Sequence, residues 1–237
     1  MFIGHHAVAF AAKKIAPNTS LGTLVAAAQF LDLLWPPLLL TGIEHARIEP
    51  GITAVSPLDL YDYPLSHSLA GALLWSILFG GLYSVFKKYH KRTSLSGSAL
   101  TIGAIVLGLT VFSHWVLDFI THRPDMLLWF SGTTYVGLGL WNSWAGTILV
   151  EGGLFAIGGL LYMRSTKSND RVGTYGWWGY VVFLLTMYVA SLLGPPPPDT
   201  GVLAVGGNAG WLFVLWAWWF DTHRTAVQAE PIPASRV

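Results

Sequence analysis

The sequence predicts an all-α, polytopic membrane protein with six transmembrane helices and a short amino-terminal half-helix. Three observations lead to this fold class. Hydrophobic residues make up 53% of the chain and charged residues only 11%, whereas a typical soluble domain has about 25% charged residues. Six runs of sequence are nearly free of charge and long enough to cross a bilayer. Lys and Arg gather in alternate loops, as is typical of proteins with several spans.

The six nearly charge-free runs follow one another along the chain. Each has about the 20 residues that an α-helix needs to cross ~30 Å of hydrocarbon. Asp32, Asp118 and Glu151 are the acidic residues within them. In chain order, the runs cover residues 20–42, 65–86, 95–121, 127–163, 172–194 and 200–220.

Residues 2–16 are apolar but too short to cross the membrane, and we expect a half-helix there. Lys13 and Lys14 follow the apolar part, which is the reverse of the order in a secretory signal peptide. A helix that ends at Lys14 on the cytoplasmic face would carry His5 and His6 about 12–14 Å into the membrane. Such a segment is tolerated where protein covers its exposed end.

The distribution of basic residues predicts the orientation of the chain. Apart from Arg47 and Arg123, every Lys and Arg falls on one side of a six-span path. The positive-inside rule places this side, and both termini, in the cytoplasm. The loop at 43–66 then lies outside, where we expect irregular structure, and residues 223–237 are expected to form a disordered cytoplasmic tail. Four polar residues of the outer loop are expected to be solvated: Glu44, His45, Asp59 and Asp62.

Ionisable side chains interrupt the apolar runs at similar depths. His114, Asp118 and His122 are spaced i, i+4, so a helix places all three on one face. Asp32 lies within the first run, and His67 opens the second. Counting ~1.5 Å per residue puts these groups in the middle and outer half of the membrane. Ionisable residues are costly there, and they mark ion binding, proton relay or contact with a partner.

A divalent metal site is the leading explanation for this convergence. The chain has no cysteine, and imidazole and carboxylate ligands without sulfur suit zinc, with manganese or iron as alternatives. Asp118 or Glu151 is a candidate general base, and His122 is a candidate for orienting or protonating a leaving group. Taken singly, each residue also fits a structural role as a hydrogen-bonded group. The expected ligands are His6 or His5, Asp32, His67, His114 and Asp118.

At these positions the chain resembles the YdjM-type family of bacterial inner-membrane proteins, described as membrane-bound metal-dependent hydrolases. The shared layout is an amino-terminal histidine, Asp32 late in the first span, the pair His67-Ser68 and the stretch Ser113-His114-x3-Asp118-x3-His122. The family is distantly similar to zinc-dependent phospholipase C. The resemblance therefore implies a bacterial inner-membrane hydrolase for a phosphoester or related lipid-linked bond. Where family members carry a Pro-Asp-x-Asp-His cluster, this chain has Leu31-Asp32-Leu33, which leaves out one ligand.

The resemblance covers residues 1–125, and residues 126–222 add three spans outside it. The sequence leaves two other functions open. A transporter or channel would use the same His and Asp side chains to move protons or metal ions, although few polar residues continue toward the cytoplasmic side. A structural subunit of a membrane complex would use the Gly-rich fourth span and the Trp-rich sixth span as packing surfaces. A lipid or lipid-linked small molecule is the expected substrate, and nucleic acid is not an expected partner.

Overall fold

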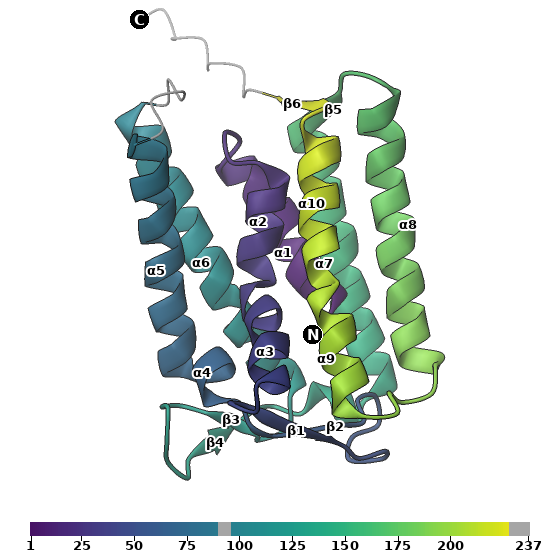
Figure 1. Cartoon of the computed structure of the whole chain (residues 1–237). Helices are drawn as coiled ribbons and strands as arrows, with labels where there is room; N and C mark the ends of the chain where they lie inside the picture. The colour runs from purple at the N-terminus through teal and green to yellow at the C-terminus, as the bar shows by residue number, and fades with distance from the viewer. Residues whose placement is uncertain (90–95, 228–237) are drawn as a thin grey trace, which may run out of the picture.

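The computed structural model describes residues 1–89 and 96–227, which are mostly helical. Long helices stand side by side, and short strands lie at both ends of the bundle (Figure 1). The helices are α1 (Ile3–Ile15), α2 (Leu21–Ala28), α3 (Phe30–Leu40), α4 (Pro64–His67), α5 (Leu69–Tyr89), α6 (Gly97–Thr121), the 3-10 turn η1 (Leu140–Asn142), α7 (Trp144–Ser165), α8 (Arg171–Leu193), α9 (Thr200–Asn208) and α10 (Gly210–Asp221). The strands are β1 (His45–Ile48), β2 (Leu58–Asp62), β3 (Met126–Leu127), β4 (Tyr135–Val136), β5 (Thr166–Ser168) and β6 (Arg224–Ala226).

Five helical segments within the described residues are long and apolar enough to cross a membrane, namely α5, α6, α7, α8 and the α9–α10 pair. The pair α2–α3 passes the same test only when it is taken as one span, and its two helices are bent by 56°. Large apolar side chains such as Ile77, Leu149 and Leu193 are more than 70% exposed. A surface of this kind fits a multi-pass membrane protein whose helices face lipid.

Side-chain caps explain where five of the helices begin. Ser20, Ser96, Ser143, Asp170 and Asp199 each accept a hydrogen bond from a backbone N–H in the first turn of the following helix. Each cap satisfies one of the amide groups that lacks a partner at a helix start. The boundaries of α2, α6, α7, α8 and α9 are therefore encoded locally.

Three sequence expectations require correction. The fourth apolar run begins at residue 127, but α7 begins only at Trp144, after β3, β4 and η1. The outer loop contains an antiparallel hairpin of β1 and β2. Residues 224–226 form β6, which pairs with β5, so this part of the expected tail is ordered. The remainder of that tail, 228–237, lies outside the described residues.

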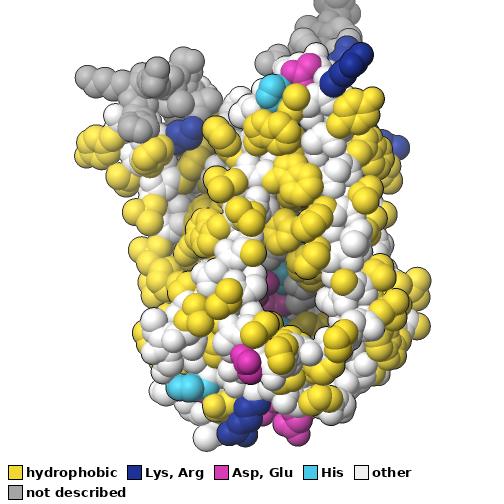
Figure 2. Space-filling view, turned by 45° about the vertical axis from the view of Figure 1, so that its right-hand side comes forward, with side chains coloured by type: hydrophobic (Ala, Val, Ile, Leu, Met, Phe, Trp, Pro, Cys, Tyr) yellow, Lys and Arg dark blue, Asp and Glu magenta, His cyan; other side chains and the backbone are white. Residues whose placement is uncertain are grey.

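Basic side chains gather at one end of the bundle, as the orientation argument requires. The carboxyl ends of α1, α5 and α7, the start of α8 and strand β6 all lie at the upper end in Figure 1. Their Lys and Arg residues lie at this end, whereas Arg47 and Arg123 belong to segments at the opposite end. Figure 2 shows apolar side chains covering the face between these two ends.

Helix α1 begins inside the bundle and runs to the basic end (Figure 1). It packs most extensively on α7. The close approach depends on Gly158, because a Cβ atom there would collide with the backbone of Ala7. The contact between Gly158 and Ala7 thus fixes how far the amino-terminal end of α1 lies inside the bundle.

Replacing Gly158 with Ala is expected to destabilise the protein, because the new methyl group forces α1 and α7 apart. Overpacking of this kind costs about 1–3 kcal/mol. Gly152→Ala in the same helix is the matched control, since a Cβ at Gly152 meets no atom within 4 Å and Ala raises helix propensity by ~1 kcal/mol. The free energy of unfolding in mixed detergent micelles measures the effect of both substitutions. Equal stabilisation by the two substitutions would contradict the role given to Gly158.

A buried ion pair joins four helices near the basic end. Lys13 Nζ donates to Asp221 Oδ2 at 2.8 Å and to the Thr19 carbonyl at 2.9 Å. The Asp221 carboxylate also accepts from Tyr162 Oη and from the Leu21 amide, both at 2.8 Å. These bonds tie α10 to α1, α2 and α7 at a point where both charged side chains are less than 10% exposed.

Candidate metal centre

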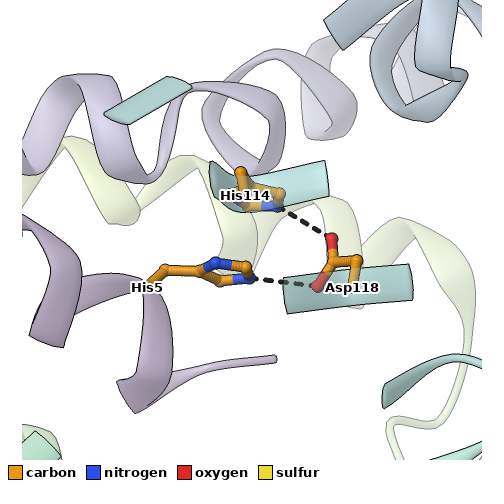
Figure 3. Close-up of side chains that lie close together, drawn as sticks. All are labelled: His5, His114 and Asp118. Atoms are coloured by element: carbon orange, nitrogen blue, oxygen red, sulfur yellow. Dashed lines mark hydrogen bonds and ion pairs between the residues drawn. The ribbon is translucent and has the colours of Figure 1, made fainter. Parts of the chain in front are cut away.

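Five ionisable side chains from four helices meet inside the bundle. The side chains come from four places: the start of α1 in the interior, α3 just after the bend, α4 ahead of the second span, and one face of α6. Figure 3 shows three of these side chains pointing toward one another. The five are His5, Asp32, His67, His114 and Asp118, and all except Asp32 are buried.

The first group of possible ligands consists of His5, His114 and Asp118. The two oxygens of Asp118 lie 3.1 Å from His5 Nε2 and 3.0 Å from His114 Nε2. The two imidazole rings stack almost in parallel, with centroids 3.6 Å apart. Because His114 and Asp118 are one turn apart on α6, the i, i+4 spacing brings their side chains to the same place.

The second group consists of Asp32, His67 and His114. Asp32 Oδ1 lies 3.5 Å from His67 Nε2 and 3.6 Å from His114 Nε2. His67 Nε2 is also 3.7 Å from Asp118 Oδ2. The two groups therefore share His114, and Asp118, a member of the first group, borders the second.

Outer hydrogen bonds orient the rings of three histidines. His114 Nδ1 lies 2.7 Å from the carbonyl oxygen of Ala28, the last residue of α2 before the break to α3. His67 Nδ1 lies 2.7 Å from Ser66 Oγ. His122 Nδ1 lies 3.2 Å from Asp125 Oδ1. Metal-binding histidines usually bond the nitrogen away from the metal in this way, because the bond fixes both tautomer and orientation.

The chemistry of His114 calls for a positive charge in the cluster. Since the Ala28 carbonyl only accepts hydrogen bonds, His114 Nδ1 carries a proton, and the ring in its neutral form presents a lone pair at Nε2. In the part of the chain that the structure describes, this buried Nε2 has no hydrogen-bond partner, and carboxylate oxygens of Asp118 and Asp32 face it at 3.0 and 3.6 Å. Acceptors that face one another need a proton or a cation between them. Two imidazoles and a carboxylate on each side suit a divalent ion such as zinc.

The buried amino group of Met1 is a further charged neighbour of the cluster. Its nitrogen lies 2.7 Å from Asp118 Oδ1 and is fully buried. Asp118 Oδ1 thus contacts two nitrogens, those of Met1 and His5, while Oδ2 faces His114. Asp118 is the residue on which most contacts of the centre converge.

Three residues expected at the site lie outside both groups. His6 points instead into an aromatic region, where its Nδ1 lies 3.2 Å from Tyr180 Oη and its ring meets Phe213 edge-on. Glu151 Oε2 accepts hydrogen bonds from the amides of Phe2 and Gly4, which caps the start of α1. Among the described residues, no hydrogen bond or ion pair joins Glu151 to the cluster, so its expected general-base role stays a prediction.

His122 borders the cluster without joining either group. It follows the last residue of α6 as its C-cap and has extended backbone angles. Its Nε2 is 3.8 Å from Asp118 Oδ1, and its ring stacks on Trp141 with centroids 4.3 Å apart. The position is suited to exchanging a proton with a molecule bound beside Asp118.

Sequence reasoning missed the residues that support the histidines from outside. Glu44, expected to be solvated, is fully buried and bonds Ser66. Asp59 is also buried and pairs with Arg123. Tyr63 donates to Asp125 at 2.8 Å, and burial together with the Asp125 charge raises the pKa of the Tyr63 phenol well above its usual range. These residues lie in polar loops, where a sequence pattern cannot separate a buried carboxylate from a solvated one.

Access to the cluster lies beside Asp32. The Asp32 side chain is 42% exposed, whereas that of Asp118 is 2% exposed. Figure 2 shows a hollow in the apolar face of the bundle, with acidic and His side chains at its floor. The charged cluster is therefore reached from the side of the bundle, through a surface that is otherwise apolar.

Comparison with known proteins adds no assignment, since no family model, curated protein or solved structure matches this chain.

Proposed function

We propose that the chain is a metal-dependent hydrolase of the bacterial inner membrane, as its resemblance to the YdjM-type family implies. Zinc is the proposed metal, with manganese or iron as alternatives. The proposal rests chiefly on one observation: within the described residues, the buried His114 Nε2 has no hydrogen-bond partner and faces two carboxylates where the two ligand groups meet. A metal ion bound there would polarise a phosphoryl oxygen and lower the pKa of a water molecule.

In such a reaction, some residues would bind the metal and another would transfer the proton. His5, Asp32, His67, His114 and Asp118 would hold the ion. His122 would exchange the proton with the leaving oxygen, because its Nε2 faces the cluster while Asp125 holds its Nδ1. General acid–base catalysis by a positioned imidazole of this kind typically contributes about 10²–10⁴-fold to the rate.

The proposed membrane arrangement has six spans, with α2–α3 as a broken span and α1 as a re-entrant half-helix. The end of α1 and strand β6 would lie on the cytoplasmic side, because they belong to the basic end of the bundle. The amino terminus itself lies inside the bundle, where the Met1 nitrogen is 2.7 Å from Asp118 Oδ1. The cluster would then lie in the outer half of the membrane. The hollow in the apolar face opens toward lipid in this arrangement, which supports a lipid or lipid-linked phosphoester as the substrate.

Proton translocation is the main competing function, because a proton on His114 would also separate its Nε2 from the carboxylates. The core along α1 supports the hydrolase instead. Between His6 and Lys13, the buried residues of this helix are Ala7, Ala9, Phe10 and Ala12. Apolar side chains therefore separate the cluster from the buried Lys13–Asp221 pair over about 10 Å.

Metal analysis and a vesicle assay test the proposal together. Protein extracted in mild detergent is expected to contain zinc or to bind it at micromolar concentration. In vesicles of phosphatidylethanolamine and phosphatidylglycerol, it should release a soluble phosphorylated head group, and chelation should stop this release until zinc returns. Absence of metal binding would overturn the proposal. Proton flux in proteoliposomes that is lost in His114→Ala would favour translocation.

A further inference from the structure

Glu44 is a buried carboxylate in the outer loop, between α3 and β1. The residue is fully buried. Its Oε1 accepts a hydrogen bond from the Ser66 amide at 2.8 Å, and its Oε2 accepts from Ser66 Oγ at 2.6 Å. Within the described residues, Ser66 is the only residue that donates hydrogen bonds to the Glu44 carboxylate. Burying a carboxylate costs free energy, and the Glu44 carboxylate receives two hydrogen bonds in return, both from one serine. This burial therefore indicates a role other than stabilising the loop.

The hydroxyl of Ser66 connects Glu44 to the cluster. Ser66 Oγ lies 2.7 Å from His67 Nδ1, and His67 Nε2 faces Asp32 and Asp118. A serine hydroxyl has one proton to donate. The ionised carboxylate can only accept, so the Ser66 proton points to Glu44. Ser66 Oγ must then accept a hydrogen bond from His67 Nδ1, which places the imidazole hydrogen on Nδ1.

We propose that Glu44 is a positioning residue that acts through Ser66 to fix the tautomer of His67. With its hydrogen held on Nδ1, His67 turns the lone pair of Nε2 toward Asp32 and the ion. The inference rests on the proposed metal site for its consequence, although the tautomer itself is a property of the metal-free chain. Outer-shell carboxylates that orient a histidine are known to raise the affinity of metal sites.

Glu44→Gln is the sharpest test, because the amide keeps the shape of the side chain but presents one donor and one acceptor. If its oxygen accepts from the Ser66 amide, its nitrogen donates to Ser66 Oγ and releases the hydroxyl proton toward His67 Nδ1. His67 then carries its hydrogen on Nε2. A protonated Nε2 has no lone pair with which to bind a metal. We expect zinc affinity to fall by about 10–100-fold, the usual effect of losing an outer-shell partner.

Two measurements follow this change. Nitrogen-15 chemical shifts of metal-free protein labelled at histidine report which nitrogen of His67 carries the hydrogen, and competition with a zinc chelator reports affinity. Glu49→Gln is the control, since Glu49 lies exposed in the same loop. Ser66→Ala breaks the same connection while keeping Glu44, and it should also weaken the preference for hydrogen on Nδ1.

The outcomes separate this inference from the proposed function. An unchanged His67 tautomer in both Glu44→Gln and Ser66→Ala would overturn the role of Glu44, even if the native protein binds zinc and hydrolyses lipid. A native protein that binds no zinc, but whose tautomer changes in Glu44→Gln, would leave the positioning role standing and remove the hydrolase. Equal loss of affinity in Glu49→Gln would also contradict the inference.

Discussion

Replacing Asp118 with Asn is expected to abolish stoichiometric zinc binding and, with it, hydrolysis. The carboxylate contacts His5 and His114 directly and lies within 4 Å of His67 and His122. An amide keeps the volume but removes the negative charge that favours a cation. Since loss of an outer-shell partner already costs about 10–100-fold in affinity, we expect loss of this direct ligand to exceed that range.

Metal content after gel filtration, together with head-group release from vesicles, measures the effect of Asp118→Asn. Asp62→Asn is the control, because the Asp62 side chain is 45% exposed and pairs with His45 at the surface. Circular dichroism establishes that both variants remain helical. Retention of zinc by a folded Asp118→Asn protein would place the ion elsewhere and contradict the ligand set given above.

Removing the Lys13 ammonium is expected to produce the largest loss of stability. Lys13→Met leaves the Asp221 carboxylate buried without its cation, although Tyr162 and Leu21 still donate to it. Breaking a buried ion pair on one side typically costs about 3–5 kcal/mol. The free energy of unfolding in mixed micelles should fall by this amount, and α1 should become accessible to hydrogen exchange.

A double substitution separates the pair from the packing around it. In Lys13→Met/Asp221→Asn the second change removes the uncompensated charge, so the total loss should be smaller than the sum of the two single losses. Asp62→Asn again serves as a control, because an exposed ion pair contributes little. Additive losses in the double variant would show that Lys13 and Asp221 do not interact.

Much of the fold follows from composition and charge alone. Apolar runs correctly locate α5, α6, α8 and the α9–α10 pair, because a helix that faces lipid must be apolar over its whole length. The same signal fails at 127–163. A charge-free run does not distinguish a helix from an apolar loop, and Gly132, Gly137 and Gly139 adopt positive φ angles that helices exclude.

The residues of the candidate site, too, could be predicted only in part from the sequence. The sequence indicates His67, His114 and Asp118, because ionisable groups stand out in an apolar span. It leaves open which of His5 and His6 belongs to the cluster, since neighbouring positions on a helix differ by about 100°. The packing of α1 on α7 decides this, turning His5 toward Asp118 and His6 toward Tyr180.

By itself, the sequence determined an apolar helical protein with a basic end and with histidines and carboxylates at a common depth. Period, length and charge are local properties, so they can be read without knowing which helices touch. Only the tertiary structure decided that Glu44 and Asp125 support the histidines and that Glu151 caps α1. A carboxylate acquires such a role from partners distant in the chain, and packing alone brings those partners within hydrogen-bond distance.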